Sequence, residues 1–98
     1  MANAGKPCPT SNAFIGAINN VSGILQTTIT NPDALALTAT YSGTYTVGGE
    51  TVPFSFAGSK DGENLIKASE EIPAGATNVT GTITVHVYGC SSDFTKSF

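Results

Sequence analysis

Apolar and polar residues alternate along most of the chain after residue 12, and a period of two predicts β-strands with one buried face. The clearest run predicts a long strand over residues 79–88, with inward positions at Val79, Gly81, Ile83, Val85 and Val87. Shorter runs predict further strands over residues 14–18, 21–30, 35–41, 44–47, 50–56 and 64–69. The pattern is therefore that of an all-β chain.

Glycine and proline mark the turns between these runs. Asn31-Pro32-Asp33 predicts a turn, because proline fixes φ and the Asp side chain can bond the following backbone. Gly48-Gly49 joins two alternating runs and predicts a tight hairpin, because glycine tolerates positive φ. Pro53 lacks an N–H, so we expect residues 51–57 to lie at a sheet edge or Pro53 to face away from the ladder.

The segment 62–71 is ambiguous. A short helix here would be capped by Asp61 and ended by Pro73, but only Ile72 continues a helical stripe from Leu65. We therefore favour a strand in this segment and keep the short helix as the alternative.

Seven short β segments with glycine and proline between them predict a two-sheet antiparallel sandwich. A chain of 98 residues suffices for one such domain over residues 13–90, with a polar lead at 1–12 and a C-terminal tail at 91–98. The closing stretch IPAGATNVTGTITVHVYG, in which a turn leads into a long final strand, resembles immunoglobulin-like and fibronectin-III-like domains. The resemblance implies an architecture and no specific function.

Charged residues make up only 11% of the chain, while 14 Thr and nine Ser supply most of the surface polarity. Four Lys, no Arg and a net charge of -3 exclude nucleic-acid binding, which needs basic patches for phosphate contacts. The same balance disfavours anionic membranes, and no apolar run approaches the roughly 20 residues of a spanning helix. We expect neither nucleic acid as a partner nor insertion into a membrane.

Two cysteines, Cys8 and Cys90, flank the patterned region. They can form a disulfide that joins the first segment to the last, or remain two unpaired thiols. The disulfide would place the protein in an oxidising compartment: secreted, periplasmic or on a particle surface. No signal peptide is evident, but Ala2-Asn3-Ala4 is typical of a site left by signal cleavage, so we expect a mature secreted chain.

No constellation in the sequence predicts catalysis or metal binding. His86 is the only histidine, and its place on the Thr-lined side of the last strand predicts a solvent-exposed polar residue. The disulfide would consume the cysteine that could act as a nucleophile, and no Cys-x-x-Cys or histidine pair occurs. We expect no catalytic residue, no metal site and no cofactor.

Threonine at alternate positions is the sharpest pattern in the sequence. On the final strand it defines a candidate binding surface that consists of Thr80, Thr82, Thr84, His86 and Tyr88. Such ladders resemble the hydroxyl arrays of β-type ice-binding proteins and of carbohydrate-contacting surfaces. The simpler explanation is that threonine is a favoured strand residue that makes a sheet surface hydrophilic without adding charge.

Together these features predict a small, non-enzymatic binding module: an effector, an adhesin-like protein or a structural subunit of a virus or phage. Its partner would be a protein or a carbohydrate, and an edge strand at residues 51–57 could support oligomers. The alternative is a carrier that holds a lipid or small molecule between its two sheets, because large apolar residues such as Phe14, Ile24 and Phe56 face inward. A hydrolase is the third hypothesis.

Overall fold

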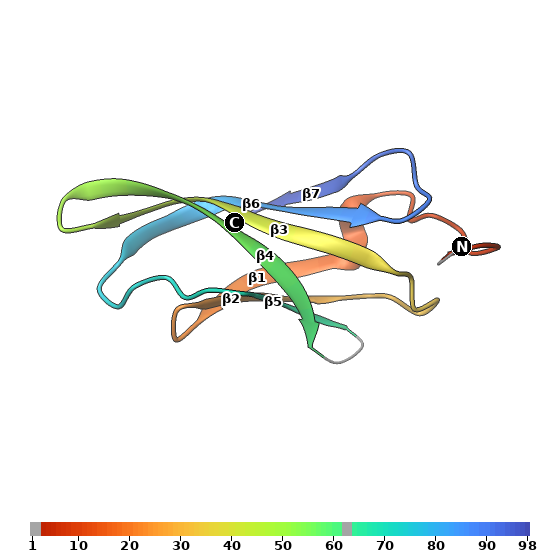
Figure 1. The fold of residues 1–98 in the computed structure, drawn as a ribbon, viewed down its shortest axis with the longest axis horizontal. Helices are drawn as coiled ribbons and strands as arrows, with labels where there is room; N and C mark the ends of the chain where they lie inside the picture. The colour runs from red at the N-terminus through yellow and green to blue at the C-terminus, as the bar shows by residue number, and fades with distance from the viewer. Residues whose placement is uncertain (1–2, 62–63) are drawn as a thin grey trace.

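The computed structural model describes residues 3–61 and 64–98, and within them the chain forms seven antiparallel strands (Figure 1). One 3-10 turn, η1 (Asn12–Phe14), precedes them and is the only helical segment of the described residues. The strands are β1 (Ile15–Val21), β2 (Ile24–Ile29), β3 (Leu37–Val47), β4 (Glu50–Asp61), β5 (Leu65–Ala68), β6 (Thr77–Val87) and β7 (Phe94–Ser97). The predicted all-β, antiparallel fold is confirmed.

The strands form one hydrogen-bonded sheet in the order β1-β2-β5-β4-β3-β6-β7, and not the two separate sheets of the predicted sandwich. In Figure 1, β1, β2 and β5 lie in a lower layer, β3, β6 and β7 lie in an upper layer, and β4 crosses from one to the other. β4 pairs with β3 over residues 50–58 and with β5 over residues 58–61. The length of β4 therefore joins both layers into one barrel-like sheet.

Side chains bridge the seam between the two ends of this sheet. The Lys96 Nζ of β7 donates to the Ile15 carbonyl of β1 at 2.8 Å, and the Asn12 amide donates to the Thr95 carbonyl at 2.6 Å. The rings of Phe14 and Phe94 pack edge to face beneath them, with centroids 5.2 Å apart. The barrel is thus nearly closed without backbone pairing between β1 and β7.

Two predicted strand boundaries are wrong because glycine plays two different roles. The predicted strand 21–30 is broken by Ser22 and Gly23, which turn the chain with φ of 53° and 91° and join β1 to β2. The predicted strands 35–41 and 44–47 are instead one strand, β3, because Gly43 stays extended. The diglycine hairpin is confirmed: Gly48 and Gly49 have positive φ, and the residues on either side of them pair.

Gly43 is needed for close approach between strands. It lies opposite Gly81 of β6, and a Cβ at Gly43 would sit 2.0 Å from the Thr80 carbonyl oxygen. A Cβ at Gly81 would sit 2.1 Å from the Ser42 carbonyl oxygen. Side chains at either position would force β3 and β6 apart, so this glycine pair sets the spacing at the centre of the upper layer.

The segment predicted as ambiguous contains strand β5, and the alternative helix near 62–71 is wrong for residues 64–71. Residues 62–63 lie outside the described residues. The predicted tail 91–98 also contains a strand, β7, which pairs with residues 82–85 of β6. β5 and β7 have only four residues each, and strands this short carry little alternation of their own.

The apolar sides of both layers meet in one core. Its fully buried side chains are Ile15, Leu25, Thr27, Ile29, Tyr41, Ile66, Ile83, Val85 and Val87. Tyr41 crosses this core from β3, and its hydroxyl donates to the Ile66 carbonyl of β5 at 2.7 Å. Burial raises the pKa of Tyr41 well above its ordinary value of 10.0, while a backbone hydrogen bond from Thr27 partly opposes that shift.

We expect the Tyr41→Phe variant to unfold about 1 to 2 kcal/mol more easily at neutral pH, because the Ile66 carbonyl loses its buried side-chain donor. The raised pKa means that Tyr41 stabilises the fold fully below about pH 10 and progressively less above it. Urea unfolding at about pH 9 and about pH 11 tests both points. The wild type should lose about 1.4 kcal/mol more than the variant over that range, and equal losses would contradict this role.

Candidate binding surface

The outer side of the upper layer carries an array of hydroxyl groups from four adjacent strands, which we call the hydroxyl face. Strand register places Ser55 of β4, Ser42 of β3, Thr82 of β6 and Ser97 of β7 in one continuous row. Neighbouring strands lie about 4.8 Å apart, so a row of this kind spans roughly 14 Å. The face consists of Thr38, Thr40, Ser42, Thr44, Ser55, Thr80, Thr82, Thr84, Thr95 and Ser97.

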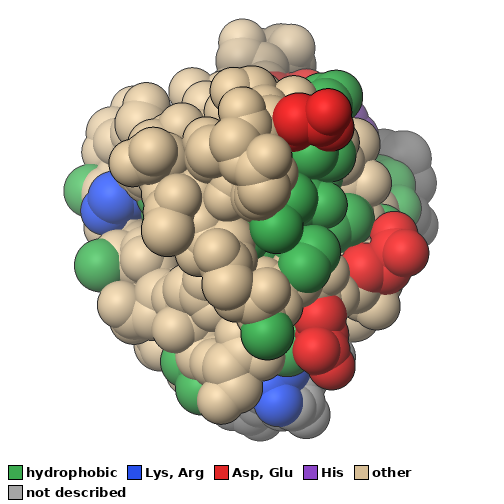
Figure 2. Space-filling view, turned by 90° about the vertical axis from the view of Figure 1, so that its left-hand side faces the viewer, with side chains coloured by type: hydrophobic (Ala, Val, Ile, Leu, Met, Phe, Trp, Pro, Cys, Tyr) green, Lys and Arg blue, Asp and Glu red, His purple; other side chains and the backbone are tan. Residues whose placement is uncertain are grey.

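The hydroxyl face is uncharged. Among the described side chains, no Lys, Asp or Glu occupies an outward position of β3, β4, β6 or β7. Glu50 of β4 and Lys96 of β7 both stand at positions that alternate toward the inner side of the sheet. Seen from the β3–β4 hairpin end in Figure 2, much of the surface likewise carries neither charged nor hydrophobic side chains. In the described part of the chain, no side-chain hydrogen bond uses these hydroxyls, so they are available to solvent or to a partner.

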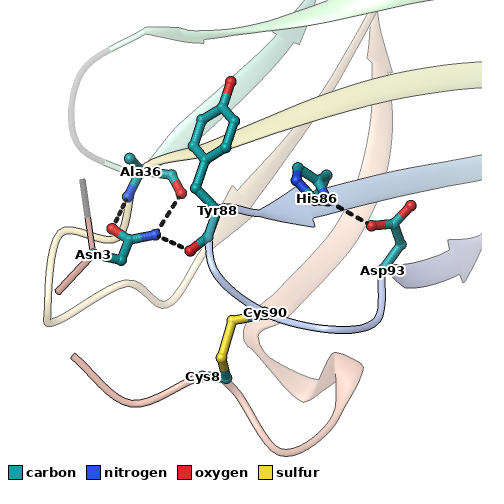
Figure 3. The surroundings of a disulfide bond; sticks show 7 residues. All are labelled: Asn3, Cys8, Ala36, His86, Tyr88, Cys90 and Asp93. Carbon is teal, nitrogen blue, oxygen red and sulfur yellow. Dashed lines mark hydrogen bonds and ion pairs between the residues drawn. A yellow bond between two sulfur atoms is a disulfide. The ribbon is translucent and has the colours of Figure 1, made fainter. Parts of the chain in front are cut away.

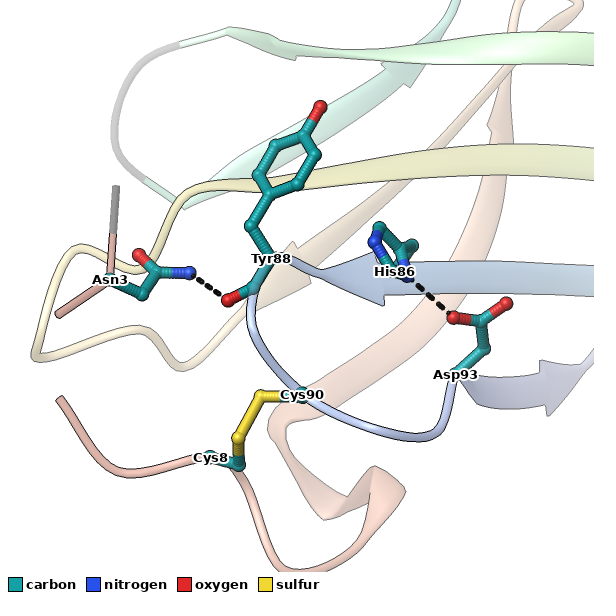
Figure 4. Close-up of polar contacts among 6 residues, drawn as sticks. All are labelled: Asn3, Cys8, His86, Tyr88, Cys90 and Asp93. Carbon is teal, nitrogen blue, oxygen red and sulfur yellow. Dashed lines mark hydrogen bonds and ion pairs between the residues drawn. A yellow bond between two sulfur atoms is a disulfide. The ribbon is translucent and has the colours of Figure 1, made fainter. Parts of the chain in front are cut away.

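His86 and Tyr88 continue the β6 row to the end of the molecule that carries the disulfide. The His86 Nδ1 lies 2.8 Å from the Asp93 Oδ1, and both side chains are about half exposed, at 45% and 50%. The Tyr88 ring stands edge-on to the His86 ring with centroids 5.4 Å apart, and it is 45% exposed (Figure 4). One aromatic ring and one polar pair thus border the hydroxyl face.

The polar lead is fastened beside Tyr88. Cys8 and Cys90 form the predicted disulfide, with Cα atoms 5.9 Å apart (Figure 3). The Asn3 amide donates to the carbonyls of Ala36 and Tyr88 at 2.9 and 2.8 Å and accepts from the Ala36 N–H at 2.7 Å. These hydrogen bonds tie the lead to the residue just before β3 and to the residue just after β6. The lead therefore fixes the position of Tyr88. A disulfide is compatible with an oxidising compartment.

Two hollows flank the lead. One, of about 560 Å³, is lined by the lead together with Leu35, Tyr88 and Cys90. The other, of about 400 Å³, lies between the lead and the end of the barrel and has an apolar floor of Phe14, Leu35 and Leu37. Both open at the surface. Of the residues predicted to face inward, Phe14 and Phe56 pack against the core, while Ile24 is partly exposed and does not belong to it.

All five residues of the predicted surface lie along the outer side of β6 or just after it. Thr80, Thr82 and Thr84 share the hydroxyl face, and His86 and Tyr88 adjoin it. Sequence reasoning missed Asp93 and Asn3. The only signal for Asp93 was its position after the Cys90 turn, and nothing in the pattern paired Asn3 with Tyr88 across 85 positions.

Within residues 3–61 and 64–98, no three side chains of His, Cys, Asp or Glu lie close enough together to hold a metal ion. No helix among the described residues is long and apolar enough to cross a membrane. Comparisons with protein-family models, with curated proteins and with solved structures found no match to this chain.

Proposed function

We propose that the chain is a non-enzymatic binding module, secreted or displayed on a particle surface, that contacts a neutral polysaccharide through its hydroxyl face. The observation that carries this proposal is the register of β4, β3, β6 and β7, which aligns unbonded hydroxyls across four strands with no charged side chain among them.

The chemistry of this face suits an uncharged, hydroxyl-rich partner. Each Ser or Thr hydroxyl can donate one hydrogen bond and accept others, as can each sugar hydroxyl. Contact would desolvate no charge on the face itself, so the large penalty for burying an unpaired ion does not arise. The exposed Tyr88 ring at the end of the face offers an apolar surface against which a sugar ring can pack.

A non-enzymatic role is supported by the surroundings of the single histidine. The His86 side chain makes a polar contact with Asp93 and a ring contact with Tyr88. No hydrogen bond within the described residues joins it to a Ser, Thr or Cys side chain, as a Ser-His or Cys-His pair would require. Both cysteines are held in the disulfide. An extracellular location fits that bond and the low share of charged residues.

We further propose that the fold is a variant of the immunoglobulin-like or fibronectin-III-like sandwich. Its first, second and fifth strands share one layer, and its third, sixth and seventh strands share the other. That grouping is the one found in immunoglobulin domains, where the fourth strand extends the first layer. Here β4 bonds to both layers, which accounts for the barrel-like closure.

The proposal predicts that Thr82→Lys weakens polysaccharide binding at least about tenfold, because a long cation would cover the centre of the hydroxyl face. Asn19→Lys is the matched control, since Asn19 is exposed on β1, a strand that does not belong to the hydroxyl face. Affinity electrophoresis in gels that contain a β-glucan, a xylan, a galactomannan or dextran measures the binding. Retardation of the wild type and Asn19→Lys, but not of Thr82→Lys, is the expected result.

Two outcomes would overturn the proposal. One is no retardation of the wild type by any of these neutral polysaccharides. The other is equal weakening by the two lysine variants, which would show that the loss reflects general charge and not contact with the hydroxyl face.

A carrier of a small apolar molecule is the second candidate. It is favoured by the hollow of about 400 Å³ beside Phe14, Leu35 and Leu37, a volume within the usual range for ligand sites. The ligand would sit at the end of the barrel under the lead, and not between the layers, where the core side chains pack together. Bound apolar ligand in the purified protein, together with absent polysaccharide binding, would favour this candidate.

A further inference from the structure

One half of β4 is an open strand edge. Residues 50–57 pair with β3 on one side, while β5 pairs with β4 only from residue 58 onward. Within the described residues no strand lies on the other side of this half. Figure 1 shows the β3–β4 hairpin projecting from the barrel, which gives the molecule its long dimension of 50 Å.

The direction of the free backbone groups follows from the hairpin. Val47 and Glu50 flank a two-residue turn and face each other, so the backbone groups of alternate residues from Thr51 onward point away from β3. The Ala57 carbonyl confirms this alternation, because it accepts from the Ser69 N–H at 2.8 Å on the side away from β3. Thr51, Pro53 and Ser55 therefore direct their backbone groups toward the open edge.

Pro53 has two consequences at this edge. It costs no hydrogen bond to β3, because its nitrogen points outward. It also removes one donor from the edge, and a two-fold pairing of two β4 edges would lose that donor from both copies. Pairing of this edge with a second copy of the chain is therefore less favourable than pairing with a strand of another protein.

Aromatic side chains lie beside the open edge on the inner side of the hairpin. The Phe54 ring packs against Tyr45 and Phe56, with centroids 6.0 and 5.0 Å apart. Tyr45, Phe56 and Val52 are only partly buried. Figure 2 views the molecule from the hairpin end and shows hydrophobic side chains in a strip bordered by acidic side chains.

Acidic residues stand at both ends of the edge. Glu50 is exposed at the first residue of β4. Glu70 and Glu71 are exposed just after Ser69, which bonds Ala57 at the other end of the edge. Glu50, Glu70 and Glu71 are the charged residues of segments 50–57 and 69–76, so these two segments present negative charge to an approaching strand.

We propose that the open edge of β4 receives an extended segment of another protein as an added antiparallel strand, with apolar side chains at alternate positions and Lys or Arg at its ends. Its backbone would bond the groups of Thr51 and Ser55, and its apolar side chains would cover Phe54 and Phe56. Its basic ends would meet Glu50 and Glu70. This inference uses the edge of β4 and is independent of polysaccharide binding by the hydroxyl face.

The probe is a synthetic peptide in which Val alternates with Thr between two terminal lysines, titrated into the full chain and followed by calorimetry and by amide NMR shifts. Ser55→Pro removes an outward N–H without touching the β3 ladder, and Ser55→Ala is its matched control because it keeps that N–H. We expect binding by the wild type and Ser55→Ala and at least about tenfold weaker binding by Ser55→Pro. Binding should also weaken in high salt and when glutamates replace the terminal lysines.

Three results would overturn the proposal: no binding of the lysine peptide to the wild type, equal affinities for Ser55→Pro and Ser55→Ala, or amide shifts that map away from residues 50–57. Pro53→Thr gives a second check, because it restores the missing donor. This variant should bind the peptide more tightly than the wild type and should self-associate in sedimentation, whereas the wild type stays monomeric. Self-association of the wild type through this edge would show that its occupant is a second copy.

Discussion

Removal of the Cys8–Cys90 bond is expected to lower the free energy of unfolding by about 4.5 kcal/mol. The bond joins residues 82 positions apart, so it removes a large share of the freedom of the unfolded chain. A domain of this size is stable by only about 5 to 10 kcal/mol. Urea unfolding of the Cys8→Ser, Cys90→Ser double variant should therefore show a marginally stable protein.

Reduction of the wild type provides the control for this prediction. A reductant should shift the unfolding midpoint of the wild type to that of the double variant and leave the double variant unchanged. A loss below about 1 kcal/mol would mean that the hydrogen bonds of Asn3 and the strand pairing already hold the ends together without the disulfide.

Gly43→Ala is expected to destabilise the protein by about 3 kcal/mol or more. The added Cβ would lie 2.0 Å from the Thr80 carbonyl oxygen and 2.7 Å from the Gly81 Cα, and both contacts are backbone that cannot rotate away. Relief requires β3 and β6 to separate where nine register pairs join them. The loss should appear as a lower urea midpoint and as faster hydrogen exchange of β3 and β6 amides.

Ser42→Ala is the matched control for Gly43→Ala, because it changes the neighbouring residue of the same strand on the outer side. It should shift the unfolding free energy by no more than about 0.5 kcal/mol. Comparable losses in the two variants would show that the strand spacing at the glycine pair adapts to a methyl group.

How far the sequence predicts the fold depends on whether a strand has its own alternation. The long strand β6 and the β3–β4 hairpin have a clear alternation of apolar and polar residues, and both were located from the sequence alone. β7 has four residues, and its pairing with β6 is set by contacts such as Phe14 with Phe94 that no local pattern contains. The role of Gly43 could not be predicted either, because a glycine in a turn and a glycine where two strands approach closely look the same in sequence.

The candidate surface was predicted one strand at a time. Alternation placed Thr80, Thr82 and Thr84 on one side of β6, but the row that runs through Ser42, Thr82 and Ser97 exists only through strand register. That all seven strands form a single sheet could not be predicted from the sequence either, because it depends on β4 being long enough to pair with β5 after leaving β3. Local patterns thus predict which face is polar, and topology decides how wide that face becomes.

An amide NMR shift map of the whole chain, titrated with a neutral polysaccharide that retards it in gels, tests most directly whether the hydroxyl face is the binding surface. We expect shifts confined to the outward residues of β3, β4, β6 and β7, including Thr40, Thr82 and Thr95, and to Tyr88. Shifts that instead gather around Phe14 and Leu35 under the lead, or on β1 and β2, would contradict binding through the hydroxyl face.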